Sequence, residues 1–514
     1  MKNSSFYIIL SLTAIRLVTA AEPHHTAFKP EIPKTWDEQA LAALEVPAPD
    51  PNFSPVAFPV EYYHRIPVRP IYKSYPVYAP GREPAGYMDM LSHAEPVILW
   101  DDKGNRPRLE SKADWIAAGE LVFDAAIFYG LVTTVEQVRS EEWHQKVQPP
   151  ISPNGTFPFA GYVIREKGKV ELGNNACAFC HTRAMPDGAI IKGAQGNFAF
   201  DRAVAYNSND TVDQLRTNYR VLFGAPWLQE HNPVADVDTK SKEELLATLA
   251  AIPPGVLARH RASATSPPAV PDLIGVEHQR YLDKSGLVRQ RGIGDLMRYA
   301  ALNNEMDFLS RFGDFIPSGT NFRTLPDPTG PDVPGEGRYS DEQLYALALY
   351  LYSLKPPLNP NLPTTPAQQA LVQQGREVFD REDCYRCHAP ETGYTNNKLI
   401  PAPGFTVPEN HPDAAHIMKR SIGSDPTLTL YTRRGTGFYK VPSLLGLWYR
   451  SPLEHNGSVA TLEDWFDPRR LDDDYVPTGW KGYGVNTRAV QGHEFGLDLD
   501  EGDRKALIAF LRTL

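Results

Sequence analysis

The sequence contains little cysteine, no long apolar run and no excess of positive charge. Its 514 residues include only four cysteines, and its formal net charge is −10. No segment beyond the first 20 residues is apolar over the length that a bilayer-spanning helix requires, so we expect a soluble mature chain that does not span a membrane. The acidic balance argues against binding to nucleic acid and favours a basic or neutral partner.

The first 20 residues have the pattern of a secretory signal peptide. Lys2 gives a positively charged start, residues 6–14 form a short apolar run, and residues 18–20 supply the small side chains of a cleavage site. Arg16 interrupts this pattern after the apolar run. We expect residues 1–20 to be removed on export, which predicts a periplasmic or secreted protein.

All four cysteines lie in two copies of one motif. The segments Cys177-Ala178-Phe179-Cys180-His181 and Cys384-Tyr385-Arg386-Cys387-His388 both read Cys-x-x-Cys-His, which is typical of covalent attachment of c-type haem. The two thiols of such a motif add to the two vinyl groups of one porphyrin, and the adjacent His is the proximal ligand of the iron. The sequence therefore predicts two covalently bound c-type haems. The predicted attachment residues are Cys177, Cys180, Cys384 and Cys387, with His181 and His388 as iron ligands.

Other uses of paired cysteines explain these segments less well. A structural zinc site would leave two histidines unexplained, and a disulfide does not require a His directly after each pair. A thioredoxin-like redox pair accounts for one copy of the motif but not for two. Attachment of haem also agrees with the predicted export, because it takes place outside the bacterial cytoplasm.

Proline separates the chain into parts. The sequence has 47 prolines, and residues 21–95 combine Pro and Tyr without helical periodicity, so we expect an extended arm wrapped on the body of the protein. Residues 129–175, which also contain several prolines, are expected to form a loop. The Pro-rich segment 356–361 is the best domain boundary. It divides an N-terminal haem domain with large insertions, residues 96–357, from a C-terminal cytochrome c domain, residues 358–514.

Helix signals surround the second motif. Thr365 is a predicted N-cap, Pro366 occupies the first helical turn and Gln368 completes a capping box. This helix leads directly into the motif, and a second amphipathic helix is predicted over residues 500–514. A helix before the motif and a last helix that crosses it is the arrangement in which a cytochrome c domain encloses its haem.

The N-terminal part has similar signals further from its motif. Ser111 and Asp114 predict the start of a helix over residues 111–128, and Ser340 predicts the start of another over residues 341–354. The expected fold is therefore mainly α, with two cytochrome c-like haem domains, long loops and the N-terminal Pro-rich extended arm.

Three further stretches resemble the bacterial dihaem cytochrome c peroxidase and MauG superfamily. They are residues 439–448, which read Tyr-Lys-Val-Pro-Ser-Leu-Leu-Gly-Leu-Trp, residues 452–464, and residues 492–496, which read Gly-His-Glu-Phe-Gly. The long spacing between the motifs and the element at 492–496 are most similar to the rubber-oxygenase-like branch. The resemblance is specific over residues 367–514, looser over 173–354, and does not extend to the arm.

The resemblance implies different roles for the two haems. In that family the C-terminal haem is six-coordinate and transfers electrons, whereas the N-terminal haem keeps one position open for peroxide or dioxygen. His493 matches the place from which the distal ligand of the C-terminal haem comes. His455 is the alternative, and it is more typical of a His that bonds a haem propionate or a backbone carbonyl. Two His ligands imply a lower reduction potential than His with Met.

The resemblance also suggests partners and a further ion. The expected partners are a small redox protein or another periplasmic electron donor, together with a small-molecule oxidant or an unsaturated substrate. Members of the family often hold a calcium ion between their haem domains, but the sequence shows no set of ligands that identifies such a site here.

A catalytic residue is harder to identify than the haem attachment. A peroxidase needs an acid–base residue on the distal side of its haem. Glu305 and Asp307 are the nearest candidates, although two acids on a helix more often form a solvated face. Trp227 could relay electrons between the haems, although a Trp in this setting is more often part of the core.

The same region leaves two classes of function open. His231, His260 or His278 could close the first haem and make the protein an electron carrier with two closed irons. Phe308 and Phe312 would instead suit the apolar pocket of an oxygenase acting on an unsaturated hydrocarbon. The length of the chain and the family resemblance favour an exported oxidoreductase that uses peroxide or dioxygen at the N-terminal haem.

Overall fold

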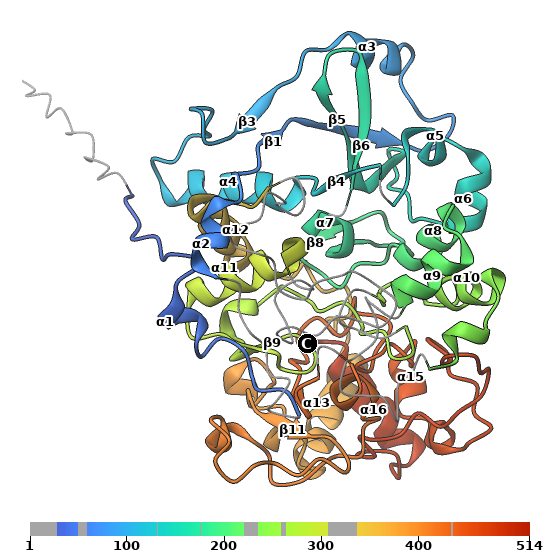
Figure 1. Ribbon diagram of the computed structural model, residues 1–514. Helices are drawn as coiled ribbons and strands as arrows, with labels where there is room; N and C mark the ends of the chain where they lie inside the picture. Colours follow the sequence, from blue (N-terminus) through green and yellow to red (C-terminus); the bar gives the residue numbers. More distant parts are fainter. Residues whose placement is uncertain are drawn as a thin grey trace, which may run out of the picture.

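The computed structural model describes residues 28–49, 59–130, 132–174, 176–219, 235–258, 264–306, 337–432 and 435–514 (Figure 1). The predicted signal peptide therefore lies outside the described residues. The helices are α1 (Glu38–Leu41), α2 (Val60–Arg65), α3 (Tyr87–His93), α4 (Lys112–Asp124), α5 (Val135–Val138), α6 (Glu141–Val147), α7 (Cys177–Cys180), α8 (Phe200–Asn207), α9 (Val212–Asn218), α10 (Lys242–Ala250), α11 (Ile293–Ala301), α12 (Asp341–Ser353), α13 (Pro366–Arg381), α14 (Thr427–Leu430), α15 (Leu462–Trp465) and α16 (Glu501–Leu511).

The strands are short and form several small sheets. They are β1 (Ile71–Tyr72), β2 (Ser74–Tyr78), β3 (Ile98–Trp100), β4 (Phe128–Tyr129), β5 (Thr156–Glu166), β6 (Lys169–Asn174), β7 (Thr182–Ala184), β8 (Ile190–Lys192), β9 (Tyr281–Leu282), β10 (Val288–Arg289), β11 (Leu399–Pro401) and β12 (Phe438–Lys440). The described residues are 36% helical and 13% strand. The prediction of a mainly α fold is therefore wrong, and the structure does not divide plainly into two cytochrome c-like domains.

The largest sheet explains much of this error. It has the antiparallel order β2-β5-β6-β4 and lies at the top of Figure 1. Residues 129–175 were expected to be a loop because of their prolines. Pro158 nevertheless lies inside β5, at a register shift where the pairing with β2 jumps from Phe157 to Gly161. Proline is tolerated at such a bulge because its missing N–H is not needed for pairing there.

The residues expected to form an extended arm also contribute to sheets and short helices. Strand β2 lies in the four-stranded sheet, and β1 pairs with β3. Nearer the N-terminus, the amide of Val46 donates to the carbonyl of Leu287, and the amide of Arg289 donates to the carbonyl of Leu44. This part of the chain is thus hydrogen-bonded to the β9–β10 hairpin, because a Pro-rich segment can still donate and accept at its other residues.

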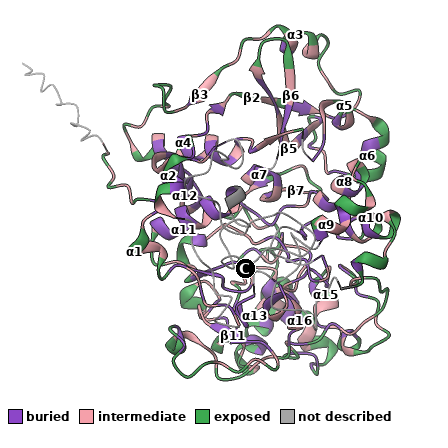
Figure 2. Ribbon diagram, in the orientation of Figure 1, coloured by how far each residue is buried: buried purple, intermediate pink, exposed green. Residues whose placement is uncertain are grey.

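Helix starts were the most reliable part of the sequence interpretation. Capping boxes are present at Ser111, at Ser340 and at Thr365, as predicted. Helix α12 is buried along almost its whole length, and Figure 2 shows it largely in the colour of buried residues. The predicted last helix is α16, with Asp500 as its N-cap.

Two pairs of helices cross with the same local geometry. A Cβ placed on Gly119 of α4 would lie 2.0 Å from the carbonyl oxygen of Ala346 in α12, and a Cβ placed on Gly375 of α13 would lie 1.9 Å from that of Ala506 in α16. Both glycines begin the pattern Gly-x-x-Val-Phe. Only glycine allows the two backbones to approach this closely. One such crossing therefore accompanies each half of the chain that carries a Cys-x-x-Cys-His motif.

A buried ion pair joins the middle of the chain to its C-terminal part. The guanidinium of Arg289 contacts the carboxylate of Asp413 at 2.5 Å, and the Tyr281 hydroxyl donates to the same carboxylate at 2.9 Å. Burial would raise the pKa of Asp413, but the hydrogen bonds and charge of Arg289 outweigh it, so the pKa lies below its usual value. The division at residues 357 and 358 stays a prediction.

Candidate functional site

The second Cys-x-x-Cys-His motif forms one tight turn directly after α13. Asp383 has a left-handed backbone, with φ of 59°, and reverses the chain after the helix. A short 3₁₀ segment, Cys384–Arg386, follows, and the amide of His388 donates to the carbonyl of Cys384 at 2.9 Å. Neither cysteine of the motif is in a disulfide. The turn therefore presents two thiols and one imidazole from a single short segment.

The His388 imidazole is oriented for ligation through its other nitrogen. Its Nδ1–H donates to the carbonyl of Tyr394 at 3.1 Å. A hydrogen bond of this kind fixes the ring and leaves Nε2 as the basic nitrogen, which is how ligating histidines are commonly held. Burial lowers the pKa of His388, so the imidazole stays neutral, as a metal ligand must be.

A large cavity lies against this turn. Its volume is about 570 Å³, within the range of sites that hold sizeable organic ligands. Cys384, Cys387, His388 and His493 all line it. Most of the remaining wall is apolar, and it includes Phe379, Ile400, Met418, Ile422, Leu444, Leu447, Leu453, Leu462, Trp465, Phe466, Leu507 and Leu511.

His493 faces His388 across this cavity. The centroids of the two imidazole rings are 6.3 Å apart, with an angle of 51° between the ring planes. Two metal–nitrogen bonds of about 2 Å each, with about 1 Å from each nitrogen to its ring centre, place the centroids of two axial imidazoles about 6 Å apart. The observed spacing therefore leaves room for one metal ion between the rings.

The environment of His493 also suits a ligand. Burial, followed by the nearby His388, lowers the pKa of His493 to about 4, which keeps the imidazole neutral. Its Nδ1 atom is buried without a hydrogen-bond partner among the described residues. A buried polar ring that lacks one partner is costly unless another group satisfies it.

Arg470 and Gly492 hold the backbone of His493 in place. The buried guanidinium of Arg470 donates to the carbonyls of Val490 (2.5 Å), Gly492 (2.9 Å) and His493 (2.8 Å). A Cβ on Gly492 would lie 2.4 Å from the backbone nitrogen of Ser424. His493 itself has a positive φ of 49°. These contacts fix an otherwise unfavourable backbone so that the imidazole points at His388.

The cysteine environment does not match a redox or zinc site. Burial, followed by the charge of Glu382, raises the pKa of Cys384 to about 11, and burial raises the pKa of Cys387. Catalytic and redox thiols instead have lowered pKa values, because the thiolate is the reactive form. The two thiols, the two facing imidazoles and the apolar cavity together fit a covalently attached haem.

One ring nitrogen of His455, the alternative distal residue, has a partner, whereas its Nε2 is buried without one among the described residues. Its Nδ1 is 2.6 Å from a carboxylate oxygen of Glu454, and its ring lies 4.5 Å from that of Tyr439. Burial would raise the pKa of Glu454, but the charge and hydrogen bond of His455 lower it overall. His455 lines the same cavity but is held by a carboxylate, whereas His493 lies opposite His388.

The first Cys-x-x-Cys-His motif forms helix α7 and leads into the β7–β8 hairpin. The Nδ1–H of His181 donates to the carbonyl of Pro271 at 3.0 Å, which corresponds to the bond from His388 to Tyr394. The amide of His181 donates to the carbonyl of Cys177 at 2.9 Å. The two motifs therefore present their histidines in the same way.

The predicted catalytic residues are not among the side chains that the structure describes. Trp227 and Asp307 lie outside the described residues, and so does the side chain of Glu305. The same holds for His231, His260, Phe308 and Phe312. His278 is exposed at the end of a 3₁₀ segment, Val276–His278. Their proposed roles stay predictions.

Sequence reasoning missed the residues that support the site. Lys284, Lys440 and Arg450 line the cavity, and Arg470 clamps His493, although none of them belongs to a haem motif. A usable signal was present for two of them, because Lys440 and Arg450 lie in or next to the stretch 439–448. No pattern in the sequence indicated that Lys284, more than 150 residues earlier, would reach the same cavity.

The described residues contain no group of three or more His, Cys, Asp or Glu side chains arranged to hold a metal ion, so calcium binding stays a prediction. No helix in the described part of the chain is long and apolar enough to cross a membrane.

Comparison with known proteins gives only distant similarity. No family model matches the chain, and no curated protein does. Among solved structures, the chain is similar to Kuenenia stuttgartiensis hydrazine synthase pressurised with xenon, at 13% identity over 60% of this chain and 94% of that one, with a TM-score of 0.28. It is also similar to a MauG-like protein associated with microbial copper homeostasis, at 17% identity over 34% of this chain and 56% of that one, with a TM-score of 0.21. Scores this low establish neither a family nor a function.

Proposed function

We propose that this protein is an exported dihaem c-type cytochrome that acts as an oxidoreductase. Cys384 and Cys387 would attach one haem, and Cys177 and Cys180 the other. The observation that carries the proposal is the cavity in which both thiols of the second motif, His388 and the facing His493 meet. One covalently attached haem, with its iron between two neutral imidazoles and its porphyrin bonded to the two thiols, would account for all four side chains at once.

The C-terminal site is proposed to exchange electrons. A haem bound there supplies a one-electron redox centre. The protein residues hold both imidazoles neutral and fixed, through the Tyr394 carbonyl on one side and the Arg470 clamp on the other. Apolar side chains make up most of the wall around the two rings. With both axial positions taken by His, this site would have a lower potential than one with Met.

The N-terminal site is proposed to bind peroxide or dioxygen. This part of the proposal rests on the resemblance to the dihaem peroxidase and MauG superfamily, in which the two haems divide these roles. Two features of the fold support an equivalent attachment at both motifs. His181 and His388 each donate from Nδ1 to a carbonyl, and a Gly-x-x-Val-Phe helix crossing accompanies each half.

The protein is proposed to act outside the cytoplasm, together with an electron donor. The signal-peptide pattern favours the periplasm or secretion. A small redox protein or another electron donor would reduce the C-terminal haem, and an oxidant or an unsaturated substrate would react at the N-terminal haem.

An electron carrier with two closed irons is the alternative. The paired imidazoles of His388 and His493 favour that role for the C-terminal site, because a closed iron can only exchange electrons. Absorption and electron paramagnetic resonance spectra of the resting protein separate the two proposals. One low-spin and one high-spin haem, with peroxide or carbon monoxide acting only on the second, would support the enzyme. Two low-spin haems in every oxidation state, neither binding carbon monoxide, would make the protein a carrier.

A further inference from the structure

Five cationic side chains line the cavity, and ligation of an iron would use none of them. They are Arg386 and Arg420, near the cysteines, and Lys284, Lys440 and Arg450. Lys284 lies in the turn between β9 and β10, Lys440 ends β12, and Arg450 follows it in the chain, yet all three line the cavity that His388 and His493 face. Burial, followed by the charge of Arg450, lowers the pKa of Lys284 to about 8. Burial, followed by the charge of Lys284, lowers the pKa of Lys440 to about 7. Lys284, Lys440 and Arg450 therefore lie close enough to repel one another.

Of these three cations, Lys284 has the fewest hydrogen-bond partners for its charged group. No hydrogen bond or ion pair to its ammonium is found within the described part of the chain. Three acids lie near it, but each is already engaged by another side chain. They are Glu454, 2.6 Å from the His455 imidazole, Asp272, 2.8 Å from the Tyr449 hydroxyl, and Asp283, 2.8 Å from the Tyr299 hydroxyl.

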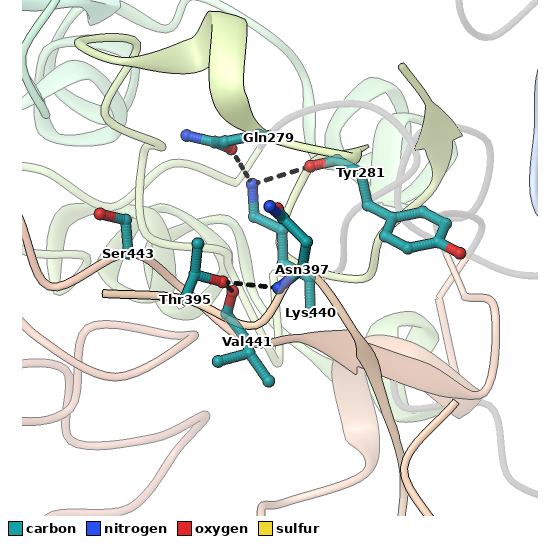
Figure 3. Close-up of a pocket in the computed structure, with 7 residues that line it drawn as sticks. All are labelled: Gln279, Tyr281, Thr395, Asn397, Lys440, Val441 and Ser443. Carbon is teal, nitrogen blue, oxygen red and sulfur yellow. Dashed lines mark hydrogen bonds between the residues drawn. The ribbon is translucent and has the colours of Figure 1, made fainter. Parts of the chain in front are cut away.

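The other two cations contact mainly neutral oxygens. Figure 3 shows the ammonium of Lys440 between the side chain of Gln279 (2.5 Å) and the carbonyl of Tyr281 (3.2 Å). Arg450 donates to the carbonyls of Ser443 and Leu445, and its Nε is 3.8 Å from Asp272. Neutral acceptors satisfy the hydrogen bonds but leave positive charge in the cavity wall, and buried charge normally requires a counter-charge.

The basic residues near the cysteines are more exposed to solvent than these three cations. Arg386 is 68% exposed in its side chain and pairs with Asp383, and Arg420 is exposed and acts electrostatically on Cys387. Lys284 instead interacts with Arg450, Glu454, Asp283 and Asp272. Lys284 is thus coupled electrostatically to Arg450 and to these acids, whereas Arg420 acts on Cys387; Arg450 also acts on His388. In haem, the two propionates lie on the edge of the porphyrin opposite the vinyl groups that the thiols attack.

We infer that Lys284, supported by Arg450 and Lys440, binds the propionate carboxylates of the haem held in this cavity. The inference rests on the proposed haem attachment and adds a residue from the middle of the chain to a site built mainly from its C-terminal part. The oxidation state of the C-terminal iron would then act directly on a side chain of the β9–β10 turn, through a charge-assisted hydrogen bond.

The test uses the full-length haem-loaded protein and three variants. Lys284→Met removes the charge and keeps an unbranched side chain, Lys284→Arg keeps the charge, and Lys505→Met removes an exposed lysine from α16 as the matched control. Spectroelectrochemistry gives the midpoint potential of the low-spin haem, and resonance Raman spectroscopy gives its propionate bending band. Haem content and low-spin character are recorded for each variant.

We expect Lys284→Met to lower the midpoint potential and move the propionate band, because loss of a nearby positive charge favours ferric iron. Lys284→Arg should stay near the wild type, and Lys505→Met should change neither quantity. If Lys284→Met carries two haems per chain but has the midpoint potential and propionate band of the wild type, the inference is overturned. The proposed function still stands in that case. Absence of covalent haem overturns both.

A carboxylate anion from solution is the alternative ligand for these cations. Potentials of the wild type are therefore measured over a range of acetate concentrations at constant ionic strength. No dependence on acetate supports the haem propionates as the bound carboxylates. A saturable dependence that disappears in Lys284→Met assigns the site to a free anion and overturns the assignment to propionate.

Discussion

The imidazole rings of His388 and His493 face each other across an apolar cavity with their centroids 6.3 Å apart. They come from positions more than 100 residues apart in the chain. His388 is fixed by the Tyr394 carbonyl and His493 by a strained backbone that Arg470 clamps. Two neutral imidazoles held at this separation are expected to bind one iron between them.

Removing His493 should open the C-terminal haem. His493→Ala is expected to convert that haem from low spin to high spin and to let it bind carbon monoxide, because one strong axial ligand is lost. His455→Ala is the matched control, since His455 lines the same cavity but pairs with Glu454. Absorption spectra with and without carbon monoxide measure both. A low-spin His493→Ala protein together with a high-spin His455→Ala protein would transfer the distal role to His455.

Arg470 is predicted to position His493 without touching the iron. Arg470→Met leaves the carbonyls of Val490, Gly492 and His493 without their donor, so the segment should loosen. We expect a mixture of low-spin and high-spin haem, with two haems still attached. Arg469→Met is the control, because the side chain of Arg469 is 78% exposed. Spin state by electron paramagnetic resonance is the measurement, and a fully low-spin Arg470→Met protein would contradict the prediction.

The crossing of α13 and α16 should not tolerate a methyl group. Gly375→Ala places a Cβ 1.9 Å from the Ala506 carbonyl oxygen, and overpacking of this kind typically costs about 1 to 3 kcal/mol. Gly502→Ala in α16 is the control, since its nearest neighbour is the flexible Asp500 side chain at 3.3 Å, and a change within about 0.5 kcal/mol is expected. Denaturant unfolding measures both. Equal stability of the two variants would show that the close crossing is not required.

The Arg289–Asp413 pair should stabilise the protein in a pH-dependent way. The pKa of Asp413 is lowered in the folded state. The stabilising contribution of its carboxylate to the free energy of unfolding is therefore fully present above the unfolded pKa of about 3.9. That contribution is lost as the pH falls through the lower pKa of the folded state. At neutral pH, Asp413→Asn should cost about 3 kcal/mol, as expected when one partner of a buried pair is removed. The difference from the wild type should shrink in acid. Asp89→Asn is the control and should change the free energy of unfolding little, because the Asp89 carboxylate is 81% exposed. If Asp413→Asn lowered that free energy equally at all pH values, the account would be contradicted.

The local parts of the fold could be predicted from the sequence. The caps at Ser111, Ser340 and Thr365 depend on side chains three residues apart, so sequence spacing alone identifies them. The strands of the large sheet were missed because Pro158 and its neighbours indicated a loop, whereas a bulge accommodates the proline. The amount of sheet in the N-terminal half therefore could not be inferred from proline content.

The candidate site was predicted in part. The two motifs singled out the thiols and the histidines that follow them, and the family resemblance singled out His493, which lies opposite His388 in the structure. Their roles in haem attachment and iron ligation stay predictions. Lys284 was missed because its place in the cavity depends on how the β9–β10 turn meets the C-terminal part, a long-range contact that no local pattern encodes. Arg470 was missed for the same reason, since its partners are backbone carbonyls.

The haem content of the mature protein tests the central claim most directly. Mass spectrometry of the denatured chain measures covalent haem, and the pyridine haemochrome spectrum counts the haems that carry two thioether bonds. Two Cys-x-x-Cys-His motifs that use all four cysteines predict a mass greater than that of the chain by two haems. They also predict two haemochromes per polypeptide that acidified acetone does not extract. A chain without covalent haem, or with haem that acidified acetone removes, would contradict the account.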